Sequence, residues 1–414
     1  MTLKTLKTLK IKLAFCFLVF VSNPYTAQNV QQQNEKNAHW VGTWATAQQL
    51  VEPNNRPPAP ELSNNTLRQI VRVSIGGNTI RIRFSNKYSA SPLQIKAVSI
   101  APALQKDEIA VNNAKNLQFS GKKEVSIPAN ADVYSDALDF PLQANSLVAI
   151  TIHYGETPTD ITGHPGSRTT SYLSTSGQEN QPKLDHPVGT DHWYSIMGIE
   201  VIAKKNSAAV AIIGNSITDG RGSGTNKQNR WTDILSQRLL ANKSTSNIGV
   251  LNLGIGGNCV VRGGLGPTAL VRFDYDILSQ QGVKWLIILE GINDIGGIRN
   301  EDQSAKVADD LIEAYKILIA KAHSKGIKVF GATILPFAKS FYDQPFRQVA
   351  RTKVNEWIRS SGAFDAIIDF DHLMESNEAG VIRNNLHDND FLHPNEAGYK
   401  TMGDFISLKL FTKK

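Results

Sequence analysis

The hydrophobic pattern of the chain changes character once, near residue 204. From His39 to about Lys204, short runs alternate apolar and polar residues with period two. The two clearest runs, residues 71–75 and 80–84, are separated by Gly76-Gly77-Asn78 and predict a β-hairpin. Similar runs between Pro, Gly and Asn clusters predict an antiparallel, jelly-roll-like β-sandwich domain over residues 39–204. These further runs cover residues 95–100, 124–127, 147–154 and 193–202.

From residue 205 onward, wholly apolar runs alternate with longer amphipathic segments. Apolar strands joined by helices predict a parallel sheet that is covered on both faces. The fold class is therefore predicted to be α/β, with a three-layer parallel-sheet domain over residues 205–414 after the antiparallel β-sandwich. In such sheets, ligands bind beyond the carboxyl ends of the strands. The predicted strands are residues 208–213, 250–255, 285–290, 328–335 and 366–370, and the predicted helices are residues 230–241, 302–325, 344–360 and 395–410.

The first residues have the composition of an export signal. Four lysines precede an apolar run over residues 13–21. This order predicts a signal peptide over residues 1–27, cleaved near Ala27, followed by a polar tether over residues 28–38. An uncleaved membrane anchor is the alternative, although the apolar run is short for a bilayer. We therefore expect a secreted or periplasmic protein with no integral membrane segment after removal of the signal.

Net charge and cysteine content limit the classes of partner. The whole chain has a formal net charge of +7, and loss of the four signal lysines lowers it to +3. A charge of this size gives little support for a nucleic-acid partner, and we expect none. Cys16 lies within the predicted signal peptide, so Cys259 is expected to be the sole cysteine of the mature chain. An intrachain disulfide is then impossible, even in an oxidising compartment.

The first predicted strand of the second region runs directly into Gly214-Asn215-Ser216. A serine at the carboxyl end of a strand projects from the rim of the sheet, and Gly214 lets the chain turn tightly there. Ser216 is therefore a candidate nucleophile. The alternative is a serine that caps a helix in a βα loop. The segment also differs from the G-x-S-x-G elbow of the α/β-hydrolases.

Two further strand ends carry hydrogen-bond donors. Residues 252–258 include Gly257 and expose backbone amides, and the next strand ends in residues 290–294, which contain Asn293. Backbone amides and an asparagine amide around one serine are the donors that an oxyanion hole requires. The alternatives are an ordinary turn at Gly257 and a helix cap at Asp294.

The segment Asp390-Phe391-Leu392-His393 stands just before the last predicted helix. An Asp three residues before a His can hold the imidazole tautomer and stabilise the imidazolium that forms when a serine loses its proton. With His387 and Asp388 the same segment resembles a metal cluster, but no matching ligand set occurs elsewhere in the sequence. We therefore predict no metal and no other cofactor.

Together, the four segments resemble the sequence blocks of the SGNH (GDSL-like) hydrolase superfamily, in the same order, over residues 208 to about 410. Four ordered matches are far more specific than any single one. The resemblance implies a catalytic triad with Ser216 as nucleophile, His393 as general base and then acid, and Asp390 as the residue that orients the imidazole.

The resemblance also implies an oxyanion hole built from the backbone amides of Ser216 and Gly257 and the side chain of Asn293. One position departs from the family pattern. The usual motif is G-D-S, and here Asn215 replaces the aspartate. Asparagine keeps the shape and the hydrogen bonding but loses the charge, which changes the electrostatics of the turn and leaves the triad complete.

Other segments are similar to a two-domain branch of this superfamily associated with xylan and other carbohydrate esters; they are residues 40–44, 67–72, 218–224, 229–231 and 272–274. This branch implies a secreted serine esterase that hydrolyses short acyl esters, acetyl esters foremost, on an acetylated polysaccharide or oligosaccharide. A lipase or general carboxylesterase with the same triad is the first alternative. A carbohydrate-binding protein with a degenerate hydrolase domain is the second, and the intact set of site residues argues against it.

Overall fold

The computed structural model describes residues 38–175 and 177–412. The predicted signal peptide and all but the last residue of the predicted tether lie outside the described residues. The chain separates into Met1–Ala38 and one compact unit, His39–Lys414. None of the helices within residues 38–175 and 177–412 is long and apolar enough to span a membrane.

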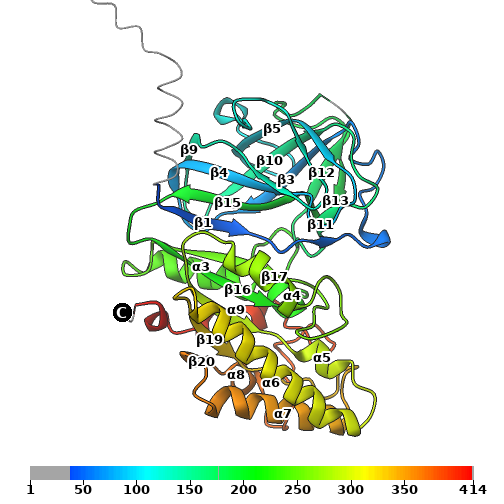
Figure 1. Ribbon diagram of the computed structural model, residues 1–414, viewed down its shortest axis with the longest axis vertical. Helices are drawn as coiled ribbons and strands as arrows, with labels where there is room; N and C mark the ends of the chain where they lie inside the picture. Colours follow the sequence, from blue (N-terminus) through cyan, green and yellow to red (C-terminus); the bar gives the residue numbers. More distant parts are fainter. Residues whose placement is uncertain (1–37, 176, 413–414) are drawn as a thin grey trace, which may run out of the picture. The chain divides into compact units, whose positions relative to one another are not determined.

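Antiparallel strands build the first part of the compact unit, up to Ile202 (Figure 1). They are β1 (Trp40–Ala45), β2 (Gln49–Leu50), β3 (Thr66–Arg72), β4 (Gly77–Ser85), β5 (Leu93–Pro102), β6 (Lys115–Asn116), β7 (Val125–Ile127), β8 (Asp132–Tyr134), β9 (Leu138–Leu142), β10 (Leu147–Tyr154), β11 (Thr162–His164), β12 (Ser171–Ser174), β13 (Val188–Thr190), β14 (Trp193–Tyr194) and β15 (Ile196–Ile202), with short 3-10 turns η1 (Pro53–Asn55) and η2 (Val111–Asn113).

These strands form three sheets in the described part of the chain. One has the order β1-β15-β4-β8, with β9 also paired to β4, and a second has the order β13-β12-β3-β10-β5-β6, with β7 also paired to β5. A small third sheet has the order β14-β11-β2. Ile82 and Phe84 of β4 and Ile150 and Ile152 of β10 are fully buried in one core. The prediction of an antiparallel β-sandwich before the parallel sheet is confirmed.

The predicted hairpin over residues 71–84 is wrong. Strand β3 pairs with β10 and β12, whereas β4 pairs with β15, β8 and β9, so the two strands belong to different sheets. Their connection crosses between the sheets and is fastened by Thr43 of β1, whose hydroxyl donates to the Ile75 carbonyl at 2.6 Å. Period-two alternation predicts burial of one face, but this pattern is the same for paired strands and for strands in facing sheets.

A parallel five-stranded sheet with helices forms the second part of the compact unit (Figure 1). Its strands are β16 (Ala208–Gly214), β17 (Ile248–Gly254), β18 (Val283–Leu289), β19 (Lys328–Ala332) and β20 (Ala366–Ile368). The helical segments are α2 (Ser216–Asp219), α3 (Trp231–Ala241), α4 (Ala269–Phe273), the π-helix η3 (Asp274–Leu278), α5 (Ile292–Gly296), α6 (Asp302–His323), α7 (Pro345–Ser360), α8 (Phe370–Met374), α9 (Glu396–Phe405) and the 3-10 turn η4 (Leu408–Phe411).

The parallel sheet has the order β17-β16-β18-β19-β20, which confirms the α/β prediction. The interior strand β16 is buried over its whole length, as its sequence Ala-Ala-Val-Ala-Ile-Ile-Gly requires. Helices α3 and α9 pack together, and so do α6 and α7. The last predicted strand is shorter than expected, because Asp369 caps a short helix by accepting from the His372 N–H at 3.2 Å.

Strand β17 is the edge of the parallel sheet, and the antiparallel part of the molecule covers that edge. The Val250 N–H of β17 donates to the Ser74 hydroxyl at 3.0 Å, and the Gly42 N–H of β1 donates to the Gln281 carbonyl at 3.0 Å. Gly249 lets the two backbones meet, since a Cβ there would overlap the Gly42 carbonyl. Covering an edge strand satisfies its backbone groups and fixes the two sheet systems against each other.

Candidate active site

Ser216 stands just beyond the carboxyl end of strand β16, as its sequence position predicts. It is the first residue of helix α2, and the Asn215 side chain caps that helix by accepting from the Ile217 N–H at 3.0 Å. A side chain at Gly214 would overlap Thr218, so the strand can turn into the helix only without a Cβ there. The turn places the Ser216 hydroxyl on the rim of the sheet, where this side chain is 7% exposed.

The structure brings Ser216, His393 and Asp390 together in one hydrogen-bonded line. Ser216 Oγ lies 2.9 Å from His393 Nε2, and His393 Nδ1 lies 2.6 Å from Asp390 Oδ2. A carboxylate can only accept, so Nδ1 must carry the hydrogen and Nε2 is left to accept from the serine hydroxyl. This is the tautomer that a general base at His393 requires.

The backbone around Asp390 keeps its carboxylate ionised. Partial burial raises the pKa of this carboxyl, but hydrogen bonds from the His393 ring, the His393 N–H and the Leu392 N–H outweigh burial and hold the pKa well below its usual range. The two backbone bonds measure 2.8 and 3.0 Å and both end on Oδ1. Oδ2 is therefore free to orient the imidazole, and the short Asp-x-x-His spacing builds this arrangement locally.

Asn293 and Gly257 lie beside the serine, where an oxyanion hole would stand. The Asn293 amide donates to the Asn258 carbonyl at 2.7 Å, and its oxygen accepts from the Tyr342 hydroxyl at 3.0 Å. These two bonds fix which way the amide points and leave its second hydrogen without an acceptor among the described residues. The N–H groups of Ser216 and Gly257 likewise donate to no other described residue. Gly257 has φ +70°, a conformation that favours glycine.

Three further residues support this arrangement, and the sequence interpretation gave none of them this role. Tyr342 lies in an irregular loop and carries no motif. A helix cap was the alternative considered for Asp294, but its carboxylate accepts from the N–H groups of Val260 and Val261 at 2.8 and 3.0 Å, which ties the Gly257 loop to α5. Arg272 is fully buried and donates to the carbonyls at the ends of β16 and β17.

A cavity of about 350 Å³ opens onto the triad. Ser216, His393 and Asn293 line one side of it, together with Gly257. The exposed side chains of Leu265 and Phe341 border it, whereas other lining residues belong to the antiparallel part of the molecule. These others are Gln49, Glu52, Asn55, Pro165, Gly166, Arg168 and His192.

A second and larger cavity, of about 670 Å³, lies behind the same wall. It shares Gly257, Asn293 and Tyr342 with the first cavity, but neither Ser216 nor His393 lines it. Its lining includes the valines and isoleucine Val261, Ile298 and Val307, the charged residues Arg262, Lys306 and Asp310, and Cys259.

Cys259 and His387 are the two other residues here with reactive side chains. Burial raises the pKa of the Cys259 thiol, which keeps it neutral and a poor nucleophile. The His387 ring packs on Phe391 with centroids 4.2 Å apart, and its Nδ1 accepts from the Phe391 N–H at 3.2 Å. Within the described residues, no group of three or more His, Cys, Asp or Glu side chains is arranged to hold a metal ion.

Glu290 gives a physical reason for the asparagine at position 215. The Asn215 amide donates to Glu290 Oε2 at 3.3 Å, and both side chains are buried. Burial raises the pKa of Glu290 to about 8, although Arg272, 3.5 Å away, lowers it. An aspartate at 215 would put a second carboxyl against a buried glutamate, and two adjacent carboxyls cannot both ionise there at low cost.

We predict that Asn215→Asp lowers the free energy of unfolding by about 1–3 kcal/mol, the usual cost of a buried polar group that loses its partner. Thermal melts near pH 8 measure this change. The double variant Asn215→Asp/Glu290→Gln restores a donor amide opposite the new carboxylate, so it should recover most of the loss. If the two substitutions add without recovery, the Asn215–Glu290 contact does not explain the asparagine.

Glu290 also makes a prediction about pH. A glutamate in an unfolded chain has a pKa of about 4.3, so between that pH and about pH 8 the folded state binds more protons than the unfolded state. The contribution of Glu290 to stability is therefore complete below about pH 4 and is lost as pH rises through the folded-state pKa. As pH rises from 5 to 9, the melting temperature of the wild type should fall further than that of Glu290→Gln. Parallel melting curves for the two proteins would contradict a protonated Glu290.

The comparisons with known proteins concern the parallel-sheet part of the chain. Residues 212–401 match the GDSL-like Lipase/Acylhydrolase family. No curated protein sequence matches the chain.

Solved structures that align with the chain include a member of the lipolytic protein G-D-S-L family from Veillonella parvula DSM 2008 (21% identity, 50% of this chain and 100% of that chain, TM-score 0.37). A GDSL-like lipase from Bacteroides thetaiotaomicron VPI-5482 aligns at 20% identity over 51% and 90% of the two chains, with a TM-score of 0.36. A catalytic mutant of an acetylxylan esterase from Geobacillus stearothermophilus aligns at 18% identity over 49% and 94%, with a TM-score of 0.37.

Residues 212–401 contain all four segments that resemble the SGNH blocks: the three at strand ends and the Asp390-x-x-His393 segment. In the parallel sheet, Ser216 follows the carboxyl end of β16 and Asn293 follows that of β18. Residues 212–401 therefore belong to the GDSL-like lipase/acylhydrolase family of the SGNH hydrolase superfamily, and the protein is a carboxylic ester hydrolase.

Proposed function

We propose that this protein is a secreted serine esterase that removes short acyl groups, acetyl groups foremost, from carbohydrate. The observation that carries the proposal is the line from Ser216 Oγ through His393 to Asp390, with contacts of 2.9 and 2.6 Å, at the wall of a cavity. A protein that had kept only a binding function would have no need of these contacts, so they count against a degenerate hydrolase.

In the acylation step, His393 Nε2 takes the proton of the Ser216 hydroxyl while Oγ attacks the ester carbonyl carbon. The carbonyl oxygen becomes an oxyanion. The unshared N–H groups of Ser216 and Gly257, and the second amide hydrogen of Asn293, are the donors proposed to stabilise it. The charge on Asp390 stabilises the imidazolium throughout this step.

Collapse of the tetrahedral intermediate breaks the bond to the leaving alcohol, which takes the proton from His393 Nε2. A water molecule then attacks the acyl-enzyme, again losing its proton to His393, and a second tetrahedral intermediate releases the acid and restores Ser216. The two attacks, by Ser216 and by water, need a free Nε2 lone pair, and the hydrogen bond from Nδ1–H to Asp390 holds the neutral ring in the tautomer that has it.

The size of the cavity supports a short acyl group. Both the acyl and the alcohol parts of the ester must reach Ser216 through the cavity of about 350 Å³, because neither Ser216 nor His393 lines the larger one. The hydrogen-bonding side chains opposite the triad, among them Glu52 and Asn55, support a polar alcohol rather than a second hydrocarbon chain.

A lipase or general carboxylesterase is the second candidate, and the larger cavity is the observation that favours it. Val261, Ile298 and Val307 offer apolar surface within a volume of about 670 Å³ directly behind Asn293. A long acyl chain would reach this volume only if the wall of Gly257 and Asn293 moved aside. Secretion belongs to the proposal as well, since it rests on the predicted signal peptide over residues 1–27.

Acetate release from a panel of acetylated polysaccharides, measured beside hydrolysis of short and long p-nitrophenyl esters, tests the proposal. We expect acetate release from at least one polysaccharide, and kcat/KM for the nitrophenyl esters that falls with acyl length. A higher kcat/KM for octanoyl than for acetyl esters, without acetate release from any polysaccharide, would favour the lipase instead.

A further inference from the structure

The cavity at Ser216 has two walls that come from different parts of the chain. The triad wall belongs to the parallel-sheet region. The facing wall belongs to the antiparallel region and presents Glu52, which directly precedes η1, and Asn55, which ends it, together with Arg168 and His192 from loops near β11 and β14. We refer to Glu52, Asn55, Arg168 and His192 as the sandwich wall.

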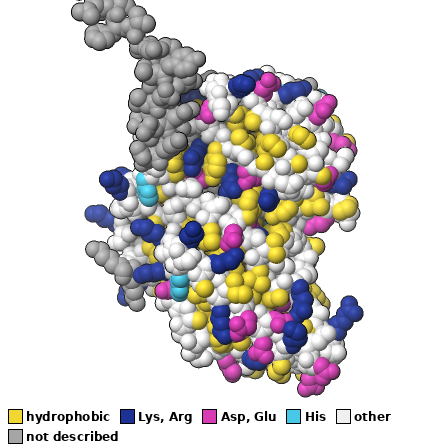
Figure 2. Space-filling view, in the orientation of Figure 1, with side chains coloured by type: hydrophobic (Ala, Val, Ile, Leu, Met, Phe, Trp, Pro, Cys, Tyr) yellow, Lys and Arg dark blue, Asp and Glu magenta, His cyan; other side chains and the backbone are white. Residues whose placement is uncertain are grey.

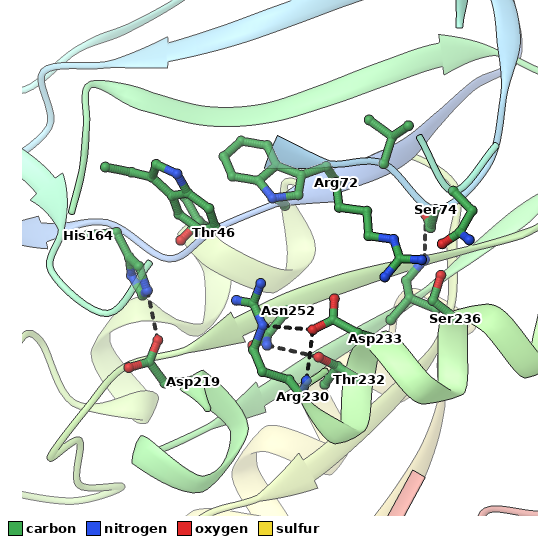
Figure 3. Close-up of a pocket in the computed structure, with 16 residues that line it drawn as sticks. Thr46, Arg72, Ser74, His164, Asp219, Arg230, Thr232, Asp233, Ser236 and Asn252 are labelled. Atoms are coloured by element: carbon green, nitrogen blue, oxygen red, sulfur yellow. Dashed lines mark hydrogen bonds and ion pairs between the residues drawn. The ribbon is translucent and has the colours of Figure 1, made fainter. Parts of the chain in front are cut away.

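Buried contacts hold the sandwich wall beside the nucleophile. Asp219, three residues after Ser216, accepts from His164 Nε2 at 2.8 Å and from Arg168 at 2.9 Å, and its side chain is 1% exposed. Figure 3 shows the His164 ring directed at this carboxylate. Burial raises the pKa of Asp219, but Arg168 and His164 outweigh it and lower the pKa below its usual range. An ionised, buried carboxylate of this kind fixes the position of both partners.

The close approach of the two walls is also built into the backbone. Gly166 lies against Asp219 so tightly that a Cβ would overlap the carboxylate. Arg168 has φ +50°, an uncommon conformation for a side chain of its size, and its carbonyl accepts from the Asn226 N–H at 3.0 Å. Such strain persists only where the surroundings enforce it, and it clusters at ligand sites.

The polar groups of the sandwich wall are set in place before any ligand arrives. Gln49 donates to Glu52 Oε1 at 2.5 Å and Asn55 donates to Glu52 Oε2 at 3.0 Å, which orients the carboxylate within the cavity lining. The Arg168 Nε–H is buried and has no acceptor among the described residues. His192 Nδ1 lies 2.6 Å from the Pro165 carbonyl. The Nε2 atom of the same ring makes no hydrogen bond to the described residues.

We infer that the sandwich wall is the subsite for the alcohol part of the ester, and that it selects a polyhydroxylated alcohol. This inference rests on the proposed function and deepens it. An oriented carboxylate accepts from two neighbouring hydroxyls, and the guanidinium group donates to their oxygens. Because His192 Nδ1 donates to the Pro165 carbonyl, the Nε2 atom of the neutral ring accepts from a further hydroxyl. An alkyl alcohol would cover the same charged groups without replacing their hydrogen bonds to water, which is unfavourable.

On this inference, the antiparallel region has a role in this enzyme: it completes the active site and determines specificity for the leaving group. The parallel-sheet region supplies the nucleophile, the base and the oxyanion donors. The sugar is recognised by the sandwich wall, whose residues all precede the boundary near residue 204 and lie at least 24 residues before Ser216 in sequence.

The test measures kcat/KM for an acetylated xylo-oligosaccharide and for p-nitrophenyl acetate on three proteins: wild type, Glu52→Gln and Glu156→Gln. Glu52→Gln removes one charge from the sandwich wall, and Glu156→Gln makes the same change at an exposed position outside the cavity lining. We expect Glu52→Gln to lower kcat/KM for the oligosaccharide at least tenfold more than for p-nitrophenyl acetate, mainly through KM. Glu156→Gln should leave the ratio of the two values as in wild type.

The outcomes separate failure of the inference from failure of the proposed function. Equal losses on both substrates in Glu52→Gln, or no loss, overturn the sandwich wall as the alcohol subsite while wild-type deacetylation still supports the proposed function. A wild type that cleaves only the nitrophenyl ester overturns both the carbohydrate substrate and the inference, and leaves the serine mechanism standing. Binding of the deacetylated oligosaccharide to Ser216→Ala, measured by calorimetry with and without Glu52→Gln, reports on the subsite without catalysis; equal affinities contradict it.

Discussion

Ser216→Ala should lower ester hydrolysis by several orders of magnitude and leave the fold unchanged. No other side chain in the cavity lining can take over the attack, because the Cys259 thiol lies in the larger cavity and burial raises its pKa. The Ser216 side chain makes one hydrogen bond among the described residues, to His393, so alanine removes that bond and leaves the backbone contacts of Ser216 in place. Release of p-nitrophenol from the acetyl ester, followed at saturating and limiting substrate, measures the loss.

The matched control is Ser244→Ala, which removes a serine hydroxyl from an exposed position far from the catalytic motifs in sequence. Both variants should keep the circular dichroism spectrum and the melting temperature of the wild type, and only Ser216→Ala should lose activity. Near-normal activity in a correctly folded Ser216→Ala protein would remove Ser216 as the nucleophile.

Asn293→Ala should lower kcat roughly 100- to 1000-fold, about 3 to 4 kcal/mol of transition-state stabilisation, with a much smaller change in KM. The reason is that its amide is oriented by Asn258 and Tyr342 before substrate arrives, and the unshared hydrogen meets charge only once the oxyanion forms. Steady-state kinetics on p-nitrophenyl acetate, with a melting curve on the same preparation, measure both the catalytic and the structural effect.

Tyr342→Phe is the companion variant, since it removes the hydroxyl that donates to Asn293 Oδ1 and leaves the amide itself in place. It should lower kcat by less than Asn293→Ala does. A purely structural role for Asn293 would give a different result: turnover would be preserved and stability would fall by about 1–3 kcal/mol, the cost of the two hydrogen bonds that its side chain makes.

Local signals made the candidate site predictable. The apolar run before Gly214 predicts a buried strand of a parallel sheet, and a candidate nucleophile at its carboxyl end follows from the geometry of such sheets. The Asp390–His393 contact was also accessible from sequence, because three residues of spacing let the backbone N–H groups of residues 392 and 393 close on the carboxylate. Strand ends were misplaced by a few residues where a cap intervenes, as Asp369 does before α8.

Contacts between residues far apart in sequence were not predictable from these signals. The alternation in β3 and β4 identifies the buried faces but carries no information about pairing, so a crossing between sheets was interpreted as a hairpin. Tyr342 and Glu290 act on Asn293 and Asn215 from other loops and strands, and no local pattern marks either residue. The approach of Arg168 and His164 to Asp219 depends on how two sheet systems pack, which only the folded chain defines.

The central claim is that Ser216 is the residue acylated during turnover. Treatment of the protein with a fluorophosphonate, which reacts covalently with activated serines, followed by peptide mass spectrometry, tests it most directly. The probe mass should appear on the peptide containing Ser216, activity should fall in proportion to labelling, and His393→Ala should not be labelled, because the serine hydroxyl then has no base to activate it. Labelling of a different residue in step with inactivation, or full inactivation with Ser216 unmodified, would contradict the account.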